Sequence, residues 1–266
     1  MSALVSLSPA EPVVFPTAPV ALRIEGVRKR YGPRGNGVLA LADISLEVAR
    51  GAFVCLVGAS GCGKSTLLNL VAGLDTVDDG RIERQGRVGL LFQEAALFPW
   101  LTAAGNVELA LSLRGVERTD RKAKARELLD LVNLSGFGDR RPHELSGGMR
   151  QRVALARALA QDADLLLMDE PFGSLDAMTR DLLHDELERL WLERGFTVLF
   201  VTHDVREAVR LGDEVVVLTS RPGRVAERFE VRFGRRGRAA NPGVGALAAE
   251  ITQRLRGEVR LHGRDR

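Results

Sequence analysis

The sequence has few cysteines, few lysines and no long apolar run. Its 266 residues include two cysteines, Cys55 and Cys62. Two cysteines this close together close no large loop, which excludes a disulfide scaffold and favours a reducing compartment. The longest uncharged apolar runs, such as Leu165–Met168, are far shorter than the roughly 18–20 residues that span a bilayer. No basic region precedes an apolar segment at the start, so we expect no secretory signal. Any membrane step must belong to another chain.

Charge is unevenly distributed along the chain. The formal net charge is +3, but twelve arginines and only five acidic residues follow residue 220, while acidic residues outnumber basic ones before it. A basic tail suits anionic lipid or nucleic acid, yet a solvated terminal segment is the simpler interpretation. We therefore expect no nucleic-acid partner. The 45% hydrophobic and 27% charged content is typical of a globular chain and excludes a mainly disordered one.

Strand and helix patterns alternate along most of the chain. Continuous apolar runs, which are typical of strands covered on both faces, occur at 53–57, 88–92, 165–168, 197–201 and 214–218. Helical patterns separate several of them, at 64–72, 177–193 and 205–211. Alternating patterns at 20–26 and 44–48 predict half-buried strands. Residues 103–160 have helical spacing with turns at 114–120 and 135–142. The sequence thus predicts an α/β fold, a parallel sheet with an all-helical insert.

Composition suggests three segments. Residues 1–20 hold four of the ten prolines and no basic side chain, which predicts an irregular extension. Residues 21–230 would form the main domain, with a helical subdomain at about 95–160. Residues 231–266 form a basic tail in which Asn241 starts a short helix and Gly257 ends it. Its apolar stripe favours docking on its own domain and consists of Val244, Leu247, Ala248, Ile251 and Leu255.

A glycine-rich loop follows the strand at 53–57 and precedes a helix. Its residues, Gly58-Ala-Ser-Gly-Cys-Gly-Lys-Ser65, match the phosphate-loop pattern in the required context. Glycine allows the backbone amides to turn inward as an anion nest, and the helix N-terminus adds positive charge. Lys64 is predicted to reach the β and γ phosphates of ATP, and the Ser65 hydroxyl to bind Mg²⁺. The candidate nucleotide ligands here are Gly58, Ser60, Gly61, Cys62, Gly63, Lys64, Ser65 and Thr66.

Two carboxylates end the apolar strand at 165–168. Asp169 is predicted to hold Mg²⁺ from the strand tip, and Glu170 to polarise the attacking water as a general base. Two surface acids at a strand end would give the same pattern. Joined to the phosphate loop, the pair points to nucleotide hydrolysis.

A second anion-binding pattern lies in the helical insert. In Leu145-Ser-Gly-Gly-Met-Arg-Gln-Arg152, Ser146 is a predicted N-cap, and Gly147 and Gly148 leave amides exposed. One chain needs one phosphate cradle, so the second is surplus within it. This segment resembles the signature sequence of ATP-binding-cassette (ABC) ATPases. The resemblance implies a phosphate-loop NTPase fold with a RecA-like parallel core, an antiparallel β subdomain and an all-helical signature subdomain. It also implies a head-to-tail dimer with two ATP molecules at the interface.

Other positions match the family in order along residues 22–227. Gln93 resembles the glutamine that senses Mg²⁺ and couples to the transmembrane partner, and His203 the switch histidine at the γ-phosphate. Ser174-Leu-Asp176 resembles the loop that contacts the opposite subunit. Tyr31 resembles the aromatic residue that stacks on adenine, although a strand-end tyrosine is an alternative interpretation. The catalytic residues implied are Glu170, His203 and Gln93, the metal site Ser65, Gln93 and Asp169, and the opposite-subunit contacts Ser146, Gly147, Gly148 and Asp176.

Further segments resemble the ATPase subunits of bacterial nitrate, sulfonate and taurine importers. They are Leu97-Phe-Pro-Trp-Leu-Thr102, Pro171-Phe-Gly-Ser-Leu-Asp176 and Thr219-Ser-Arg-Pro-Gly-Arg224. The resemblance implies a peripheral subunit on the cytoplasmic face of the bacterial inner membrane. Its partners would be an identical or paired ATPase, two permease chains and, indirectly, a periplasmic or lipid-anchored substrate-binding protein. Non-uptake systems, such as lipoprotein export or cell division, and DNA-maintenance ATPases stay open as alternatives.

Three side chains carry expectations of their own. An exposed Trp100 would anchor a permease helix, whereas a buried one would pack the helical insert. Trp191, with Leu187 and Leu190 on the same helix, is expected in the core. Cys62 lies beside a helix N-terminus and near Lys64, which predicts a thiol pKa below the free value and a reactive thiolate. The alternative is a side chain that points into the protein and is inert.

Overall fold

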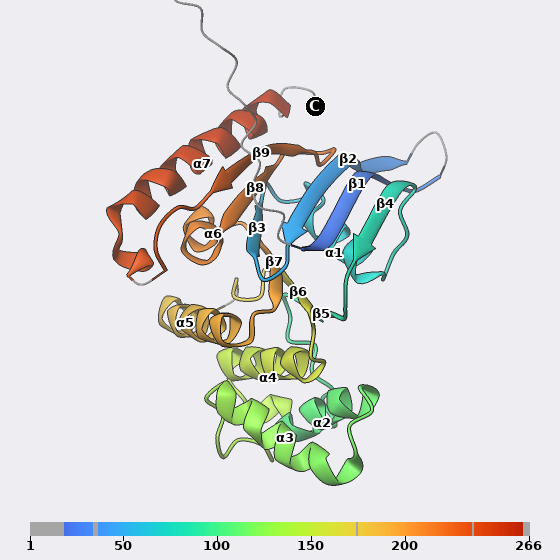
Figure 1. Cartoon of the computed structure of the whole chain (residues 1–266), viewed down its shortest axis with the longest axis vertical. Helices are drawn as coiled ribbons and strands as arrows, with labels where there is room; N and C mark the ends of the chain where they lie inside the picture. Colours follow the sequence, from blue (N-terminus) through green and yellow to red (C-terminus); the bar gives the residue numbers. More distant parts are fainter. Residues whose placement is uncertain (1–18, 34–36, 174, 236, 263–266) are drawn as a thin grey trace, which may run out of the picture.

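The structure is a computed structural model that describes residues 19–33, 37–173, 175–235 and 237–262. The expected extension at 1–20 therefore lies almost wholly outside the described residues, as does Ser174. Two sheets with helices around them make up the described part of the chain (Figure 1). A six-stranded sheet forms the centre, a three-stranded antiparallel sheet lies to one side, and α2, α3 and α4 are gathered at one end. The predicted α/β class is confirmed.

The central sheet has the strand order β5-β6-β7-β3-β8-β9 and is parallel except for β9. Its strands are β3 (Phe53–Val57), β5 (Val88–Leu91), β6 (Leu165–Asp169), β7 (Thr197–Thr202), β8 (Glu214–Leu218) and β9 (Val225–Glu230). Every residue of β3 and β7 is buried. Helices therefore cover both faces of the sheet, as continuous apolar runs predict. Strand β9 carries charged residues and was not predicted.

The antiparallel sheet has the order β2-β1-β4. Its strands are β1 (Val20–Tyr31), β2 (Val38–Ala49) and β4 (Asp79–Arg84). Strands β1 and β2 are longer than the predicted segments at 20–26 and 44–48. Their pairing continues across several register shifts into residues where apolar and polar side chains no longer alternate regularly. Strand β4 was not predicted: only Ile82 among its residues is even partly buried, so no alternation marks it.

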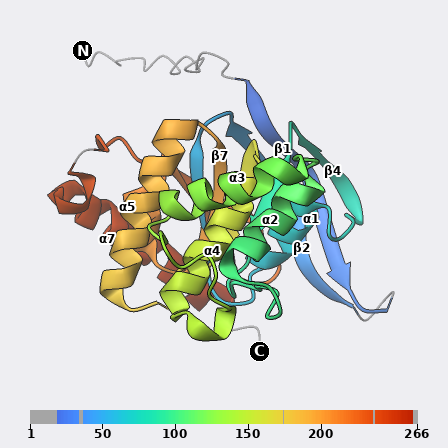
Figure 2. The ribbon, with the colours of Figure 1, turned by 90° about the horizontal axis from the view of Figure 1, so that it is seen from below.

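The helical insert contains α2 (Ala103–Leu113), α3 (Arg118–Leu131), the 3₁₀ turn η1 (Pro142–Glu144) and α4 (Gly147–Ala160). Helix α2 begins at Thr102, whose side chain accepts a hydrogen bond from the Gly105 amide. Seen from below, the three helices lie towards the viewer (Figure 2). Their buried faces join one core with the sheet, built on Val107, Leu129 and Leu155.

Four more helices flank the sheets: α1 (Lys64–Ala72), α5 (Ala177–Arg194), α6 (Val205–Leu211) and α7 (Pro242–His262), the last preceded by the 3₁₀ turn η2 (Arg238–Ala240). Helix α7 starts near Asn241 and packs on α6, with Val244, Ala248 and Ile251 buried, so the predicted docking is confirmed. The predicted end at Gly257 and the short length are wrong. A single glycine costs a helix only about 1 kcal/mol, and α7 continues beyond it.

The core consists of two clusters on opposite faces of the central sheet. In β3, Phe53, Cys55 and Val57 belong to the cluster with α2 to α6. Val54 and Leu56 belong to the cluster with α1 and the antiparallel sheet. Trp191 packs edge-on against Phe53, and its indole donates to the Gly51 carbonyl, which confirms its predicted core position. None of the helices in the described ranges combines the length and apolar character needed to cross a bilayer.

Lys29, Tyr31 and Asp75 tie the end of β1 to the segment after α1. The Lys29 ammonium lies 2.7 Å from Asp75 Oδ1, and the Tyr31 hydroxyl donates to Asp75 Oδ2 at 2.7 Å. The bond from Lys29 has the largest effect on the pKa of Asp75, and the bond from Tyr31 the next. Together they hold this pKa at about 2, below its usual value of 3.8. The ionised carboxylate therefore stabilises the folded chain above pH 4, and this contribution is lost as the pH falls towards 2.

Asp75→Asn is expected to lower the free energy of unfolding at pH 7 by about 1 kcal/mol, since the pair is partly exposed. The difference from the parent should shrink between pH 4 and pH 2. Urea unfolding across this range measures it, with Glu83→Gln on β4, an exposed carboxylate, as control. A difference that does not vary with pH would contradict the assignment.

Candidate functional site

The phosphate loop connects β3 to α1 at the side of the central sheet where the carboxyl ends of the parallel strands lie. Gly61 and Gly63 have φ of +75° and +99°, in the left-handed region that favours glycine. A Cβ atom on Gly63 would come within 2.5 Å of the Leu41 side chain. The loop therefore requires glycine at this position for both conformation and space. Ser60 is exposed at the rim, and α1 ends at Gly73, the predicted C-cap.

The Lys64 side chain folds back under this loop. It is buried, and its ammonium donates to the carbonyls of Gly58 at 2.8 Å and Ala59 at 3.2 Å. Its remaining hydrogen-bond partner in the described part of the chain is the Cys62 Sγ at 3.9 Å, and no carboxylate is among its partners. A buried ammonium with only neutral acceptors leaves its positive charge available to an anion.

Cys62 does not behave as its sequence position predicts. Its side chain is only 1% exposed, belongs to the core, and lies against Gly58, where a Cβ would be 2.6 Å from the Sγ. Burial raises the pKa of the thiol and outweighs the opposing charge of Lys64. The predicted low-pKa, reactive thiolate is therefore wrong. Because the side chain points inward, Cys62 can offer a ligand its backbone rather than its thiol.

The end of β6 lies directly beside the start of α1. The Ser65 hydroxyl lies close enough to Asp169 to lower the pKa of its carboxyl group. Burial raises the pKa of Asp169, as does the neighbouring Glu170, while Ser65 and Lys64 lower it. A desolvated carboxyl group next to a second carboxylate lacks positive charge, so a cation would be stabilised there. Carboxylate and hydroxyl oxygens are suitable ligands for Mg²⁺.

Glu170 and His203 meet at the ends of the neighbouring strands β6 and β7. Glu170 Oε2 lies 2.7 Å from His203 Nδ1, and the two side chains are 22% and 65% exposed. The Glu170 backbone has a φ of +42°, a left-handed conformation that costs a non-glycine residue about 1 kcal/mol or more. Its amide is held by the Val201 carbonyl at 2.9 Å. The structure thus joins two predicted residues that are 33 positions apart.

Tyr31 lies at the rim, near the first turn of α1. The residue is 43% exposed, and its hydroxyl is held by Asp75 and also interacts with Thr66. Burial, followed by the bond to Asp75, raises the pKa of this phenol, which stays protonated at neutral pH. The Lys29 ammonium lies over one face of the ring, 5.2 Å from its centroid, so the tether through the hydroxyl leaves the other face for stacking.

The signature segment begins α4, away from the chain's own phosphate loop. Ser146 caps the helix by accepting from the Met149 amide at 3.2 Å, as predicted. A Cβ on Gly148 would lie 2.5 Å from Thr179, and Asp176 caps α5 by accepting from the Thr179 amide. The starts of α4 and α5 therefore touch. No hydrogen bond among the described residues links 146–148 to the phosphate loop.

Gln93 is an exposed residue between β5 and α2. The Gln151 amide group approaches its carbonyl at 3.5 Å. Among the described residues, no hydrogen bond joins the Gln93 side chain to Asp169 or Ser65. The structure thus gathers the phosphate loop, Asp169, Glu170 and His203, and leaves Gln93 unjoined to them.

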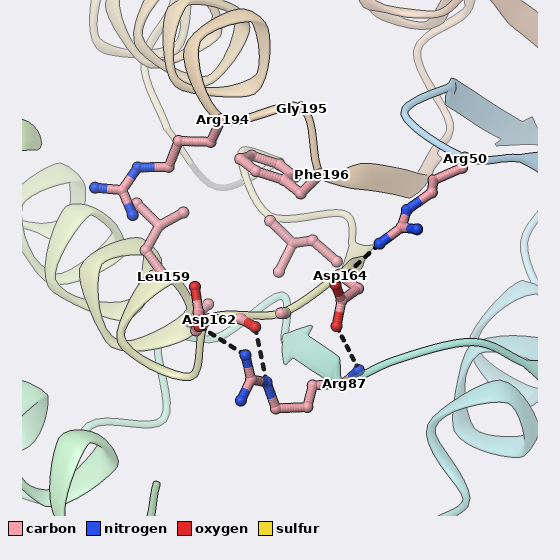
Figure 3. Close-up of a pocket in the computed structure, with 11 residues that line it drawn as sticks. Arg50, Arg87, Leu159, Asp162, Asp164, Arg194, Gly195 and Phe196 are labelled. Atoms are coloured by element: carbon pink, nitrogen blue, oxygen red, sulfur yellow. Dashed lines mark hydrogen bonds and ion pairs between the residues drawn. The ribbon is translucent and has the colours of Figure 1, made fainter. Parts of the chain in front are cut away.

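A pocket of about 220 Å³ lies on the opposite side of the sheet, at the amino ends of the parallel strands (Figure 3). Arg87 Nε and NH2 bond to Asp162, Asp164 accepts from the Arg87 amide, and Arg50 lies 3.6 Å from Asp164. These charges bind one another and hold the start of β5 to the start of β6. The pocket is therefore structural.

Sequence reasoning missed two residues next to the site. Asp75 is one, because a lone acid after a helix gives no signal. The other is Arg221, whose Nε lies 3.5 Å from the Gly61 carbonyl. A position 160 residues from the loop cannot be placed by sequence spacing.

Comparisons with known proteins agree with this geometry. Residues 41–173 match the ABC transporter family model. A taurine import ATP-binding protein, TauB, of Rhizobium johnstonii is 45% identical over 85% of this chain and 89% of its own. An uncharacterized ABC transporter ATP-binding protein of Methanocaldococcus jannaschii is also 45% identical, over 81% and 84%. A solved dimeric ATP-binding cassette in a post-hydrolysis state, bound to ADP and Pi, gives a TM-score of 0.72 at 33% identity, covering 80% of this chain and 100% of that one.

Two such relatives cover most of the chain at well over 30% identity, and the matched family region contains the phosphate loop, the signature and Glu170. The chain therefore belongs to the ABC transporter family of ATP-binding proteins and is an ABC-type ATPase.

Proposed function

We propose that this chain is the ATP-hydrolysing subunit of a bacterial importer. One observation carries the proposal: Glu170 and His203 meet at the same sheet edge as Lys64, Ser65 and Asp169. Such an edge is where open α/β sheets bind nucleotides. In the proposed reaction Glu170 orients and activates water, and His203 contacts the γ-phosphate.

The proposed nucleotide contacts follow from these positions. The amides of residues 58–66 surround the phosphates, Lys64 neutralises them, and Tyr31 stacks on adenine. Mg²⁺ fits the oxygen pair of Ser65 and Asp169, with Gln93 as a further ligand once its segment moves. In the described part of the chain, no group of three or more His, Cys, Asp and Glu side chains is arranged to hold a metal. The nucleotide would therefore supply much of the Mg²⁺ coordination, as it does in other ATPases.

The exposed start of α4 supports a dimer. Ser146 and Gly147 are exposed at this helix N-terminus, and Gly148 is buried beside them. Such a terminus binds anions, yet among the described residues no hydrogen bond links it to the phosphate loop of the same chain. We propose that it closes over ATP held by a second ATPase subunit, identical or paired, with Asp176 at the contact. The solved relative described as dimeric supports this arrangement.

A permease would occupy the groove between the sheet edge and α2. This groove holds about 680 Å³ and is lined by Leu74, Phe92, Phe98, Leu109 and Leu113. Trp100 is 67% exposed, and its ring centroid lies 5.3 Å from that of Phe98. Exposed aromatic residues beside an apolar groove suit an amphipathic helix. Two permease chains would then hold the dimer at the cytoplasmic face of the inner membrane.

The proposed domain division follows the same assignment. Residues 21–230 would form the nucleotide-binding domain, residues of about 95–160 its signature subdomain, and 231–266 a tail docked through α7. The proposed cargo is a small anion or solute such as taurine, a sulfonate or nitrate, delivered by a periplasmic or lipid-anchored binding protein. The import names of the relatives favour uptake over lipoprotein export, cell division or DNA maintenance.

Glu170→Gln is expected to bind MgATP, to hydrolyse it about 10²–10⁴-fold more slowly, and to accumulate as a dimer. The substitution removes the base but keeps the phosphate contacts. Phosphate release and size-exclusion chromatography at saturating MgATP measure the two effects. Lys64→Ala should form no ATP-dependent dimer, and Ser146→Arg should bind ATP as a monomer. Hydrolysis by Glu170→Gln at the parental rate would refute the base assignment.

Trp100→Ala is expected to weaken permease binding by ~2–4 kcal/mol without changing ATP binding by the isolated chain. Co-purification with the proposed permease and nucleotide titration measure the two quantities. Leu192→Ala is the control, since Leu192 is an apolar residue on α5 that is 59% exposed. Equal permease recovery with both variants would exclude the anchor role.

The cargo is tested through the substrate-binding protein proposed to serve this transporter. Calorimetry should detect taurine, an alkanesulfonate or nitrate at micromolar Kd, and the same compound should raise ATPase activity of the reconstituted transporter several-fold, because cargo binding favours the closed dimer. Glu170→Gln transporter is the control for ATP dependence. Binding only of an unrelated solute would reject this cargo class, while the ATPase assignment would stand.

A further inference from the structure

A buried polar pair joins α5 to α6 behind the catalytic edge. His184 is 3% exposed and Glu207 8% exposed. His184 Nε2 lies 2.6 Å from Glu207 Oε1. Neither residue contributes to the nucleotide contacts proposed above, and the two lie 23 positions apart on different helices. Burying such a pair costs desolvation free energy, so packing alone does not explain it.

Arg210 determines which nitrogen of His184 carries the proton. Its NH1 lies 3.3 Å from His184 Nδ1, and a guanidinium can only donate. Nδ1 therefore accepts, and Nε2–H donates to Glu207. Arg210 is itself held by Asp181 at 2.5 Å and Asp185 at 2.7 Å, both on α5. The imidazole is thus fixed at both nitrogens, and its orientation is determined.

The pair connects to Glu170 through Phe172. The Phe172 ring is 1% exposed and packs edge-on against the His184 ring, with centroids 5.3 Å apart. Phe172 follows Glu170 by two residues in the tight turn where the Gly173 amide donates to the Glu170 carbonyl. Because the Glu170 backbone is strained, contacts in this turn must hold it in place.

The same pair connects to His203 through α6. Glu207 lies in the first turn of α6, four residues after His203, and its amide bonds to the Asp204 cap at 3.3 Å. Asp204 is fixed in turn by the Thr202 hydroxyl at the end of β7. A carboxylate held by His184 therefore fixes the first turn of α6 and, with it, the backbone that carries His203.

We propose that His184 is a positioning residue that holds Glu170 and His203 in catalytic register. It contacts neither the nucleotide nor the reacting atoms, and it acts through Phe172 on one side and Glu207 on the other. The inference rests on the proposed roles of Glu170 and His203. A small displacement of a positioned catalytic group slows chemistry much more than it weakens binding.

Three variants separate positioning from stability. His184→Gln can keep both bonds, with its amide donating to Glu207 and its carbonyl accepting from Arg210. His184→Leu removes both. Glu186→Gln is the control, because Glu186 is also buried on α5 but bonds to Asn133, away from the site. We expect His184→Leu to lower kcat about tenfold with KM changed less than twofold, and His184→Gln and Glu186→Gln to stay within threefold of the parent.

The decisive measurement is a double-mutant cycle with His203→Ala. If His184 acts by placing His203 and Glu170, His184→Leu should slow the His203→Ala enzyme much less than it slows the parent. Should His184→Leu fail to fold, Arg210→Met replaces it in the cycle, since it frees Nδ1.

Two results would overturn the inference. One is a His184→Leu enzyme whose kcat equals the parental value. The other is a double-mutant cycle in which the losses of kcat caused by His184→Leu and His203→Ala multiply in full. Parental activity of His203→Ala would instead refute the proposed role of His203 itself, which distinguishes that failure from this one.

Discussion

Parallel pairing of β6, β7 and β3 is the constraint on which the site depends. Asp169 pairs with Val201, and Val57 pairs with Thr202, so all three strands end at one edge. The phosphate loop, Glu170 and His203 each follow one of these strands. Their proximity is thus a consequence of backbone register, and the buried apolar residues of β3 and β7 maintain that register.

Sequence patterns were sufficient to predict the bounds of several buried strands and of two helices that pack on the sheet. The bounds of β3, β8, α1 and α6 agree with the predicted ones, because continuous apolar runs and helix ends mark them. Strand β4 could not be found, since an edge strand with one half-buried residue has no alternation. Helix α7 passes Gly257 because packing on α6 outweighs a single unfavourable residue.

The site was predictable where it depends on strand ends, and unpredictable where it depends on side-chain direction. Glu170 and His203 could be expected to meet because each follows a parallel strand. The inward turn of Cys62 depends on the space beside Gly58, which spacing does not reveal. His184 and Glu207 lie on different helices, so their bond required the packing of α5 against α6. The strand topology was therefore enough to expect Glu170 and His203 to be close. The inward position of Cys62 and the bond between His184 and Glu207 depend on side-chain packing.

One chain brings together Lys64, Glu170 and His203, the groups proposed to act on ATP, but leaves the His203 side chain exposed. His203 is 65% exposed, and electrostatic stabilisation of a transferring phosphoryl group is strongest where water is excluded. The start of α4, meanwhile, presents amides that no hydrogen bond within the described ranges joins to the chain's own phosphate loop. Closure of a second subunit would satisfy both needs at once, because its helix N-terminus would complete the phosphate cradle and cover the exposed edge. Hydrolysis would then depend on association, and ATP would favour the closed state only by the contacts that both subunits supply.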